Sequence, residues 1–539
     1  MTATYIPKIP LAAALAVAFT LSPTLSQEAS EPTEPAAALT ETDIQAQLDA
    51  ADAAERVGDF ITARQIYLTL AEAGSADAQL SAAILMIEGK GGPRDMAQAS
   101  QLIEAAAAQD HPAALRIAGQ IEMANAGKLG MTARARAYWA RAAELGDTDA
   151  AYRLGQLMLR QSPDQDGAEA LRLIRFAAEN DHIAAQFRMS ELLSQGRVTP
   201  AKPEEAIAWL SKSANAGYAE AQFYMAQAIE SGAVTPKSGD AAKVALNWFR
   251  RSADGGFARA QRVMGGKYIE GADGLEPNID EAMRFFRLAA AQGEPGAQYN
   301  LGVLLASGTQ VQQNLPEAVR FFEAASERGM ADASYRAGYL LETGGPGLPM
   351  SIDRAFALYV RADQQGSEAA RFRLGELAAA NVMGNRIAPH DTVPWVLFAA
   401  GQGHEEALSW LETEADKGMR EAMHALGEYF RMAEEDGGDP RDMAQAAAWF
   451  GKASEADYPR SQIEYARLLS QGQGVEQDYL AAHKWFNIAA ARGIAEAAPL
   501  RDALTDLMDP EDIATAQAEA SAFFDRIRAQ PIPKRDEGE

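Results

Sequence analysis

The chain has 539 residues, 47% of them apolar, with a formal net charge of −26 and no cysteine. The missing cysteines exclude disulfide bonds, thiol catalysis and thiolate metal sites. The acidic balance argues against binding to nucleic acid or to anionic membrane surfaces, because both carry negative charge.

The first 26 residues have the pattern of a secretory signal peptide. Lys8 is the only charge before Glu28, and the apolar run over residues 9–21 is shorter than the ~20 residues that a membrane span needs. We therefore expect residues 1–26 to be a removable signal and the chain to be periplasmic or secreted, without stable membrane insertion. Residues 27–43 are acidic and rich in Pro, Ser and Thr, which predicts a disordered linker, with Thr40 or Thr42 capping the first helix.

From residue 44 onward a unit of about three dozen residues recurs. Each unit ends in a Gly or an Asp, residue types that tolerate the left-handed conformation found at helix ends. These turn residues stand 35–39 residues apart, with one interval of 52. They are Gly74, Asp110, Gly146, Asp181, Gly217, Gly256, Gly293, Gly329, Gly366, Gly418, Asp457 and Gly493.

Three rows of side chains keep a fixed distance from the turns. Ala stands eleven residues before every turn, and a large apolar residue stands eight before it, from Ile66 to Trp485. Gly, Ala or Ser stands nine residues after every turn except the last. Large and small side chains at helical spacing predict a helix A after each turn and an antiparallel helix B before the next. We therefore expect an all-α solenoid of about 12 helix pairs over residues 44–493.

The repeated pattern resembles the Sel1-like repeat, a relative of the tetratricopeptide repeat. Its motif comprises an A-x-x-x-L-G helix, a G-x-G-V-x-x-D loop and an A-x-x-W-[FY]-x-x-A-A helix. Segments such as AQYNLGVLLASGTQVQQNLPEAVRFFEAASERG, residues 297–329, look like this repeat. In ARLLSQGQGVEQDYLAAHKWFNIAAARG (466–493), the glycines then form the A–B loop, Asp478 caps helix B and Trp485 is a core side chain. A phosphate loop would need a preceding strand, and none is expected.

This resemblance implies a right-handed α-solenoid that acts as a scaffold or adaptor for other proteins. It also implies envelope roles such as regulation of signalling or of exopolysaccharide assembly. A carbohydrate- or peptidoglycan-binding protein is the alternative, which would need several exposed aromatic side chains on one wall.

The interval of 52 residues indicates an insertion near residues 385–403. Gly403 looks like an extra turn, but Ala is missing eleven residues before it and a small residue is missing nine after it. Helix B of this unit is therefore assigned to the stretch with Ala407 and Trp410. Trp395 then lies outside the rows, and either packs on the solenoid in a degenerate extra helix or is an exposed aromatic anchor for a partner.

Two polar rows follow the turns. Gln recurs five residues after the turn, at six units from Gln79 to Gln462, and a structural role is expected for it. Arg recurs seven residues after the turn, where it either pairs with nearby acids or forms a basic groove for the carboxylates of a partner. The candidate partner-binding residues are Arg153, Arg188, Arg336, Arg373 and Trp395.

Beyond Gly493 the repeat stops. Residues 494–528 are expected to form two C-terminal capping helices, the second beginning at Asp509 and Pro510, and residues 529–539 a disordered tail. No histidine pair has the spacing of a helical metal site, and no HExxH or convincing G-x-S-x-G element occurs. We therefore expect no catalytic, metal or cofactor site, and not an enzyme but a protein-binding chain.

Overall fold

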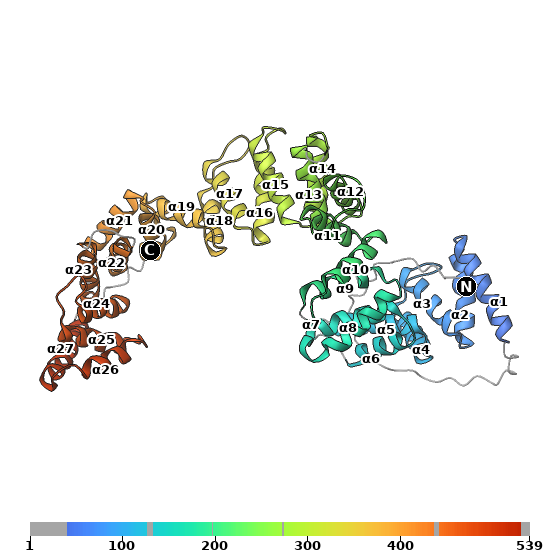
Figure 1. Ribbon diagram of the computed structural model, residues 1–539, viewed down its shortest axis with the longest axis horizontal. Coiled ribbons are helices and arrows are strands. Elements are labelled where there is room, and N and C mark those ends of the chain that lie inside the picture. Colours follow the sequence, from blue (N-terminus) through green and yellow to red (C-terminus); the bar gives the residue numbers. More distant parts are fainter. Residues whose placement is uncertain (1–39, 127–132, 197, 272–273, 436–440, 530–539) are drawn as a thin grey trace. The chain divides into compact units, whose positions relative to one another are not determined.

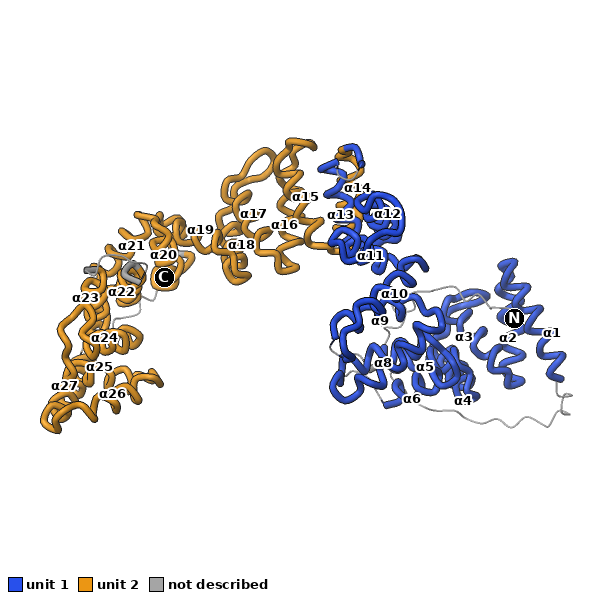
Figure 2. Tube along the Cα trace, in the orientation of Figure 1, with its two compact units in different colours: residues 1–276 blue, residues 277–539 orange. Residues whose placement is uncertain are grey.

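The computed structural model describes residues 40–529 except 127–132, 197, 272–273 and 436–440 (Figure 1). These residues belong to two compact units, called unit 1 (within residues 1–276) and unit 2 (within residues 277–539), each of which contains several repeats (Figure 2). The described residues form α-helices and one short 3-10 turn, with no β-strand beyond an isolated bridge between Gly345 and Leu348. Consecutive helices up to α26 pack against each other within each unit, so the predicted all-α solenoid of helix pairs is confirmed.

In unit 1, odd-numbered helices are A helices and even-numbered ones are B helices. They are α1 (Glu41–Arg56), α2 (Phe60–Glu72), α3 (Ala76–Glu88), α4 (Met96–Ala108), α5 (Pro112–Ala126), α6 (Ala133–Glu144), α7 (Thr148–Gln161), α8 (Pro163–Glu179), α9 (Ile183–Gln195), α10 (Pro203–Asn215), α11 (Ala219–Glu230), α12 (Ala241–Asp254) and α13 (Ala258–Glu270).

In unit 2 the same alternation holds up to α20, and α21 then interrupts it. The elements are α14 (Ile279–Ala291), α15 (Pro295–Ser307), α16 (Leu315–Glu327), α17 (Ala331–Thr343), α18 (Ile352–Gln364), α19 (Glu368–Ala379), the 3-10 turn η3 (Gly384–Arg386), α20 (Pro389–Gly401), α21 (Glu405–Asp416), α22 (Arg420–Glu435), α23 (Arg441–Glu455), α24 (Pro459–Gln471), α25 (Tyr479–Ala491), α26 (Ala497–Thr505) and α27 (Pro510–Ala529).

All twelve predicted turn residues adopt the left-handed conformation. Their φ angles are 79–96° at the glycines and 59–60° at the three aspartates. The residue after the turn donates its backbone N–H to a carbonyl five residues earlier, as from Ser75 to Leu70 at 3.0 Å. This hydrogen bond satisfies a carbonyl at the end of helix B that has no partner within its own helix.

Each aspartate turn receives a cation from the next unit. Asp110 is paired with Arg141 at 2.7 Å, Asp181 with Lys212 at 3.0 Å, and Asp457 with Arg492. A non-glycine residue is disfavoured at positive φ. The ion pair between successive units is an interaction that a glycine at the same turn does not provide.

The alanines eleven residues before the turns are buried, as predicted, with at most 4% of any of them exposed. The large side chain facing the small residue of helix A, however, stands seven residues before the turn and not eight. A Cβ added at Gly302 would lie 2.7 Å from the ring of Phe322, and one at Gly427 would lie 2.6 Å from the ring of Phe450.

All twelve side chains seven residues before a turn are buried. Eight of the twelve side chains one residue earlier, including Trp209, Trp248 and Trp449, are half-buried. Positions four residues apart share a helix face, and one residue adds a rotation of about 100°. Most of the predicted core row therefore lies at the edge of the core, whereas Leu173, Phe285, Leu358 and Trp485 are buried as predicted.

We expect Gly302→Ala to destabilise the protein by about 1–3 kcal/mol, because the added methyl group overlaps the ring of Phe322. Gly401→Ala, also in unit 2, is the matched control, since a Cβ there meets no atom within 4 Å. That control should leave stability unchanged or raise it by up to about 1 kcal/mol. Urea denaturation of both variants compares them, and equal effects would contradict the close contact of helix A with helix B.

The recurring glutamines have the structural role that the sequence predicts. Each donates its side-chain N–H to the carbonyl three residues before the turn, at 3.2–3.4 Å, in all six units from Gln79 to Gln462. Where Ser334 replaces the glutamine, Gln365 of the next unit donates to the Ser326 carbonyl at 3.0 Å and accepts from Ser334 at 2.7 Å. The side-chain amide that donates to this carbonyl thus comes from near the start or from near the end of the repeat that follows the turn.

The irregular segment supplies helix B of its unit. α19 packs on α20, and a Cβ added at Gly375 would lie 2.7 Å from that of Ala399. Gly403 has a φ of 88°, and His404 donates its N–H to the Ala399 carbonyl as at the other turns. The extra helix is α21, which packs on both α20 and α22 and carries Ala407 and Trp410. This corrects the assignment of those residues to helix B opposite α19.

Gly403 could not be recognised as a turn from the spacing because threonine stands eleven residues before it, where the other repeats have alanine. Thr392 is 3% exposed, and its hydroxyl donates to the Pro389 carbonyl of its own helix at 2.7 Å. A hydroxyl satisfied in this way can occupy a buried helix face. Nine residues beyond Gly403, Glu412 belongs to the additional helix α21, which has no helix B of its own to face.

Both ends of the described chain are helical. Thr40 forms a capping box with Asp43, so α1 begins at Glu41 and includes the last three residues of the predicted linker. α27 begins at Pro510, and both α26 and α27 pack on α25, where Phe523 contacts Trp485 at 5.3 Å between ring centres. Residues 1–39, with the predicted signal, and the tail from 530 lie outside the described residues. None of the described helices combines the length and apolarity required to cross a membrane.

Candidate functional site

Within each of the two compact units, the A helices present a surface, here called the A-helix wall. It consists of the side chains six, seven and ten residues after each turn and of the residue directly after the next turn. The sixth residue contacts the first residue of the following unit. Ring centres are 4.6 Å apart for Tyr152–His182, 5.5 Å for Phe187–Tyr218, 5.2 Å for Phe223–Phe257, 5.8 Å for Phe372–His404 and 4.9 Å for His424–Tyr458.

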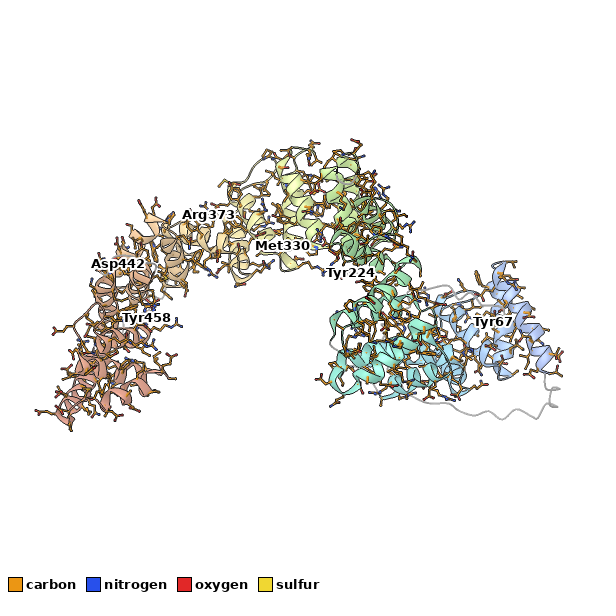
Figure 3. The ribbon with its side chains drawn as sticks, in the orientation of Figure 1. Tyr67, Tyr224, Met330, Arg373, Asp442 and Tyr458 are labelled. Atoms are coloured by element: carbon orange, nitrogen blue, oxygen red, sulfur yellow. The ribbon has the colours of Figure 1, made fainter. Side chains whose placement is uncertain are left out.

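An ion pair takes the place of the rings at one unit, where Arg116 lies 3.0 Å from Asp147. Contacts between the sixth and first residues thus link successive repeats at these places. Figure 3 labels Tyr224, Arg373 and Tyr458, which belong to the wall. The wall is the surface on which an extended partner would meet several helices in turn.

Three of the four predicted arginines pair with carboxylates close by. Arg153 lies 2.9 Å from Asp149, Arg188 lies 2.9 Å from Glu191, and Arg373 binds Glu376 at 2.8 Å and also Glu342. Arg336 differs, because its Nε donates to the neutral hydroxyl of Tyr299 at 2.7 Å. All four lie on the wall, and their binding of a partner stays a prediction.

These ion pairs shift the pKa of the acids. Burial opposes ionisation of Asp149, but hydrogen bonds from His182 and Arg153 outweigh it and hold the pKa of that carboxyl well below its usual range. Burial likewise opposes ionisation of Glu342, and hydrogen bonds from Arg373 and Tyr359 lower its pKa. Both carboxylates are therefore charged at neutral pH and compensated within the wall.

Trp395 packs on the solenoid. It is half-buried in α20, its Nε1 donates to Asp363 Oδ2 at 2.9 Å, and its ring meets Phe356 edge-on at 6.1 Å. Asp363 also accepts from Arg371 at 2.7 Å. Here an Asp–Arg pair replaces the Ala carbonyl and Gln of the other units, and Trp395 completes it. A role of Trp395 as a partner anchor stays a prediction.

Three histidines cap A helices or the helix after Gly403. His111, His182 and His404 each accept, at Nδ1, the backbone N–H three residues on, at 3.1–3.3 Å. The Nε2 atoms of His111 and His182 lie 3.0 and 3.3 Å from Asp77 and Asp149. Within the described ranges, no group of three or more His, Asp or Glu side chains is arranged to hold a metal ion.

The structure shows a depression of about 240 Å³ on the wall of unit 2 that the sequence analysis missed. His424 contributes its ring, and its Nδ1 lies 2.8 Å from Ser461 Oγ. Its position six residues after a turn, shared with aromatic residues elsewhere, was the signal that could have identified it. The lining residues are His424, Glu428, Arg460, Ile463, Glu464, Ile494 and Glu496.

Three half-buried tryptophans of the B helices are covered by cations. Lys212 lies over Trp209 at 5.4 Å, Arg251 over Trp248 at 5.1 Å and Lys452 over Trp449 at 3.7 Å from the ring centre. A sugar that stacked on these rings would compete with the cation–π contact. This arrangement gives the carbohydrate-binding alternative no support.

The Sel1 repeat model matches ten segments of the chain, over residues 76–111, 132–147, 148–182, 183–218, 219–257, 258–294, 295–330, 331–367, 420–458 and 459–494. The chain belongs to the Sel1 repeat family. Sel1 repeat proteins are generally scaffolds for interactions with other proteins. The matches leave out residues 368–419, where this Sel1 repeat protein contains Arg371, Trp395 and the extra helix α21.

Two solved structures and one curated protein are similar to this Sel1 repeat protein. The protective antigen c5321 of uropathogenic Escherichia coli strains is 23% identical, over 88% of this chain and 99% of that chain, with a TM-score of 0.48. A Sel1 repeat protein from Oxalobacter formigenes is 24% identical, over 68% of this chain and 90% of that chain, with a TM-score of 0.34. The family assignment rests on the repeat matches and not on these scores.

Chitin synthase regulatory factor 3 of Schizosaccharomyces pombe is 28% identical over 151 residues. This segment is 28% of the present chain and 14% of the curated relative. The similarity therefore covers a small part of that protein.

Proposed function

We propose that this Sel1 repeat protein is an exported, periplasmic adaptor that binds other proteins along its A-helix wall and catalyses no reaction. The observation that carries the proposal is a contact between the residue six positions after one turn and the first residue after the next turn. It recurs from Tyr152–His182 to His424–Tyr458. A repeated surface of this kind offers an extended partner many small contacts. The signal-peptide pattern of residues 1–26 supports export.

A finer role in envelope signalling or in control of polysaccharide assembly belongs to the same proposal. Its support is the name of the Schizosaccharomyces pombe relative, a regulatory factor of chitin synthase, over the matched 151 residues. Fractionation of cells that express the tagged chain tests the location. We expect the protein in the periplasmic fraction, shortened by the signal, and recovery of the full-length chain in the cytoplasm would contradict export.

Site-specific photo-cross-linking tests the binding surface. A benzophenone amino acid at Arg153 on the wall should give discrete adducts with a partner in living cells. Arg172 on α8 is the matched control, because it is also an exposed arginine paired with a carboxylate of its own helix, Glu169, at 2.6 Å. Adducts from position 172 but not from 153 would place binding on the B helices and reject the proposal.

A second pair of positions repeats the test in unit 2. Tyr339 on the wall is 50% exposed, and Leu288 on α14 is 42% exposed. Cross-linking from 339 and not from 288 is the expected result. The absence of adducts from both wall positions would contradict an adaptor that uses this surface.

A further inference from the structure

Five rings gather on the wall where α7, α9 and α11 follow one another in unit 1. His182 lies against Tyr152, while Phe187 contacts both Tyr218 and Tyr224, each with ring centres 5.5 Å apart. Phe187 is buried, and the other four side chains are half-buried. We call these five residues the aromatic patch.

The acids around the aromatic patch are compensated with one exception. Asp149 is paired with Arg153, and Glu191 is paired with Arg188, each at 2.9 Å. Glu220, at the start of α11, is half-buried and forms a hydrogen bond with the Tyr218 hydroxyl but no ion pair. The exposed Arg259 donates to the Tyr224 hydroxyl at 3.4 Å and not to Glu220.

The patch raises the cost of the negative charge on Glu220. Burial and the neighbouring Glu191 raise the pKa of this carboxyl, while the charge of Arg259 acts in the opposite direction. Burial, with Tyr218, Glu191 and Glu220 nearby, raises the pKa of Tyr152 to about 12. Groups from three successive A helices thus act on one another, and the charge of Arg259 offsets the rise in the Glu220 pKa only in part.

We propose that the aromatic patch binds a cationic side chain, lysine or arginine, of a protein partner beside the Glu220 carboxylate. The aliphatic stem of that side chain lies on the rings of Tyr152 and Tyr218, and its charge meets both the carboxylate and the electron-rich ring faces. The inference rests on the proposed adaptor function and specifies what this part of the wall recognises.

The charge of the whole chain favours the same kind of partner. A formal net charge of −26 attracts basic proteins and repels acidic ones over several ångströms of solvent. General attraction by net charge has no preferred site, however. The aromatic patch instead predicts that Glu220 contributes more to the affinity for a basic partner than an exposed carboxylate does, and an experiment has to separate these two cases.

The probe is a fluorescent ten-residue peptide of alternating lysine and alanine, compared with the same peptide acetylated on every lysine. Binding is followed by fluorescence anisotropy at 0.15 M salt. We expect the full chain to bind the unmodified peptide, and Glu220→Gln to weaken that binding by about fivefold or more. Glu179→Gln, which removes the same charge from an exposed position at the end of α8, should change the affinity by less than about twofold.

Equal weakening by Glu220→Gln and Glu179→Gln would overturn the inference, because it would show attraction by net charge alone. Equal binding of the acetylated peptide would overturn it as well. A thermal unfolding scan guards against a structural explanation. Glutamine keeps the hydrogen bond to Tyr218 and removes a half-buried charge whose pKa is raised. Glu220→Gln should therefore unfold at the same temperature as the wild type or higher, and a lower temperature would also overturn the inference.

The outcome is separable from that of the adaptor proposal. If cross-linking from position 153 persists in the Glu220→Gln background while peptide binding is insensitive to Glu220, the adaptor proposal stands and the cation site does not. If cross-linking from the wall fails in the wild type, the adaptor proposal itself fails.

Discussion

Phe450→Ala is expected to destabilise the protein by about 3–5 kcal/mol. The Phe450 side chain has no exposed surface, and its ring lies against Gly427 of the paired helix, where an added Cβ would be 2.6 Å away. Truncation removes a large apolar side chain and leaves a cavity that a glycine cannot fill. Urea denaturation followed by circular dichroism measures the loss.

The neighbouring tryptophan provides the control. Trp449 is half-buried with Lys452 over its ring, so Trp449→Ala should cost about 1–2 kcal/mol, although the removed side chain is larger. A loss for Trp449→Ala equal to or greater than that for Phe450→Ala would contradict the core position seven residues before the turn.

Acidification from pH 6.5 to about 4 should cost the wild type about 2–3 kcal/mol through His424 alone. Burial lowers the pKa of His424 to about 4, with Arg460 and Arg431 acting in the same direction and Glu428 against it. The ordinary value in an unfolded chain is near 6.5. Between these values the unfolded chain binds the proton and the folded protein does not, so stability falls as the pH falls.

His424→Gln isolates this contribution, because the acids that also lose stability at low pH are the same in both proteins. The unfolding free energies of the wild type and of His424→Gln are measured by urea denaturation at pH 6.5, 5.5 and 4.5. The two values should converge as the pH falls, because the wild type loses more stability than the variant over this range. Parallel lines for the two proteins would show that His424 titrates normally. That result would also argue against its burial between Ser461, Phe450 and Tyr458.

The repeat was visible in the sequence because its strictest requirements are steric. A left-handed turn admits few residue types, and a helix face in contact with another helix admits only small side chains, so Gly493 or Ala482 can be recognised by position alone. The choice between neighbouring large residues could not be made in this way. Trp449 and Phe450 are both large and apolar, and only the crossing of the two helices decides which ring is buried.

The irregular unit shows a second limit. Thr392 satisfies its hydroxyl within its own helix and so replaces an alanine, which a search for small apolar residues does not detect. Asp363 stands where most other repeats have Ala, and Arg371 stands where several have Gln, and the sequence shows these as two separate exceptions. Their ion pair and the hydrogen bond from Trp395 become visible only when the helices are packed.

The candidate site was predictable only in part. The recurrence of Arg153 and Arg188 identified side chains of the wall, but their carboxylate partners lie within their own helices and could be counted only once the helices were in place. Glu220 is one of 75 acidic residues, and nothing in the sequence separates it from the others. That no ion pair forms at Glu220 among the described residues follows from the orientation of three successive helices.

Hydrogen exchange of the complex with the cross-linked partner tests most directly whether recognition uses the A-helix wall. Exchange rates of the free chain and of the purified complex are compared helix by helix. We expect slower exchange on binding in the A helices α7, α9 and α11, with the B helices α8, α10 and α12 unchanged. Protection confined to those B helices or to the loops between helices would contradict recognition through the wall.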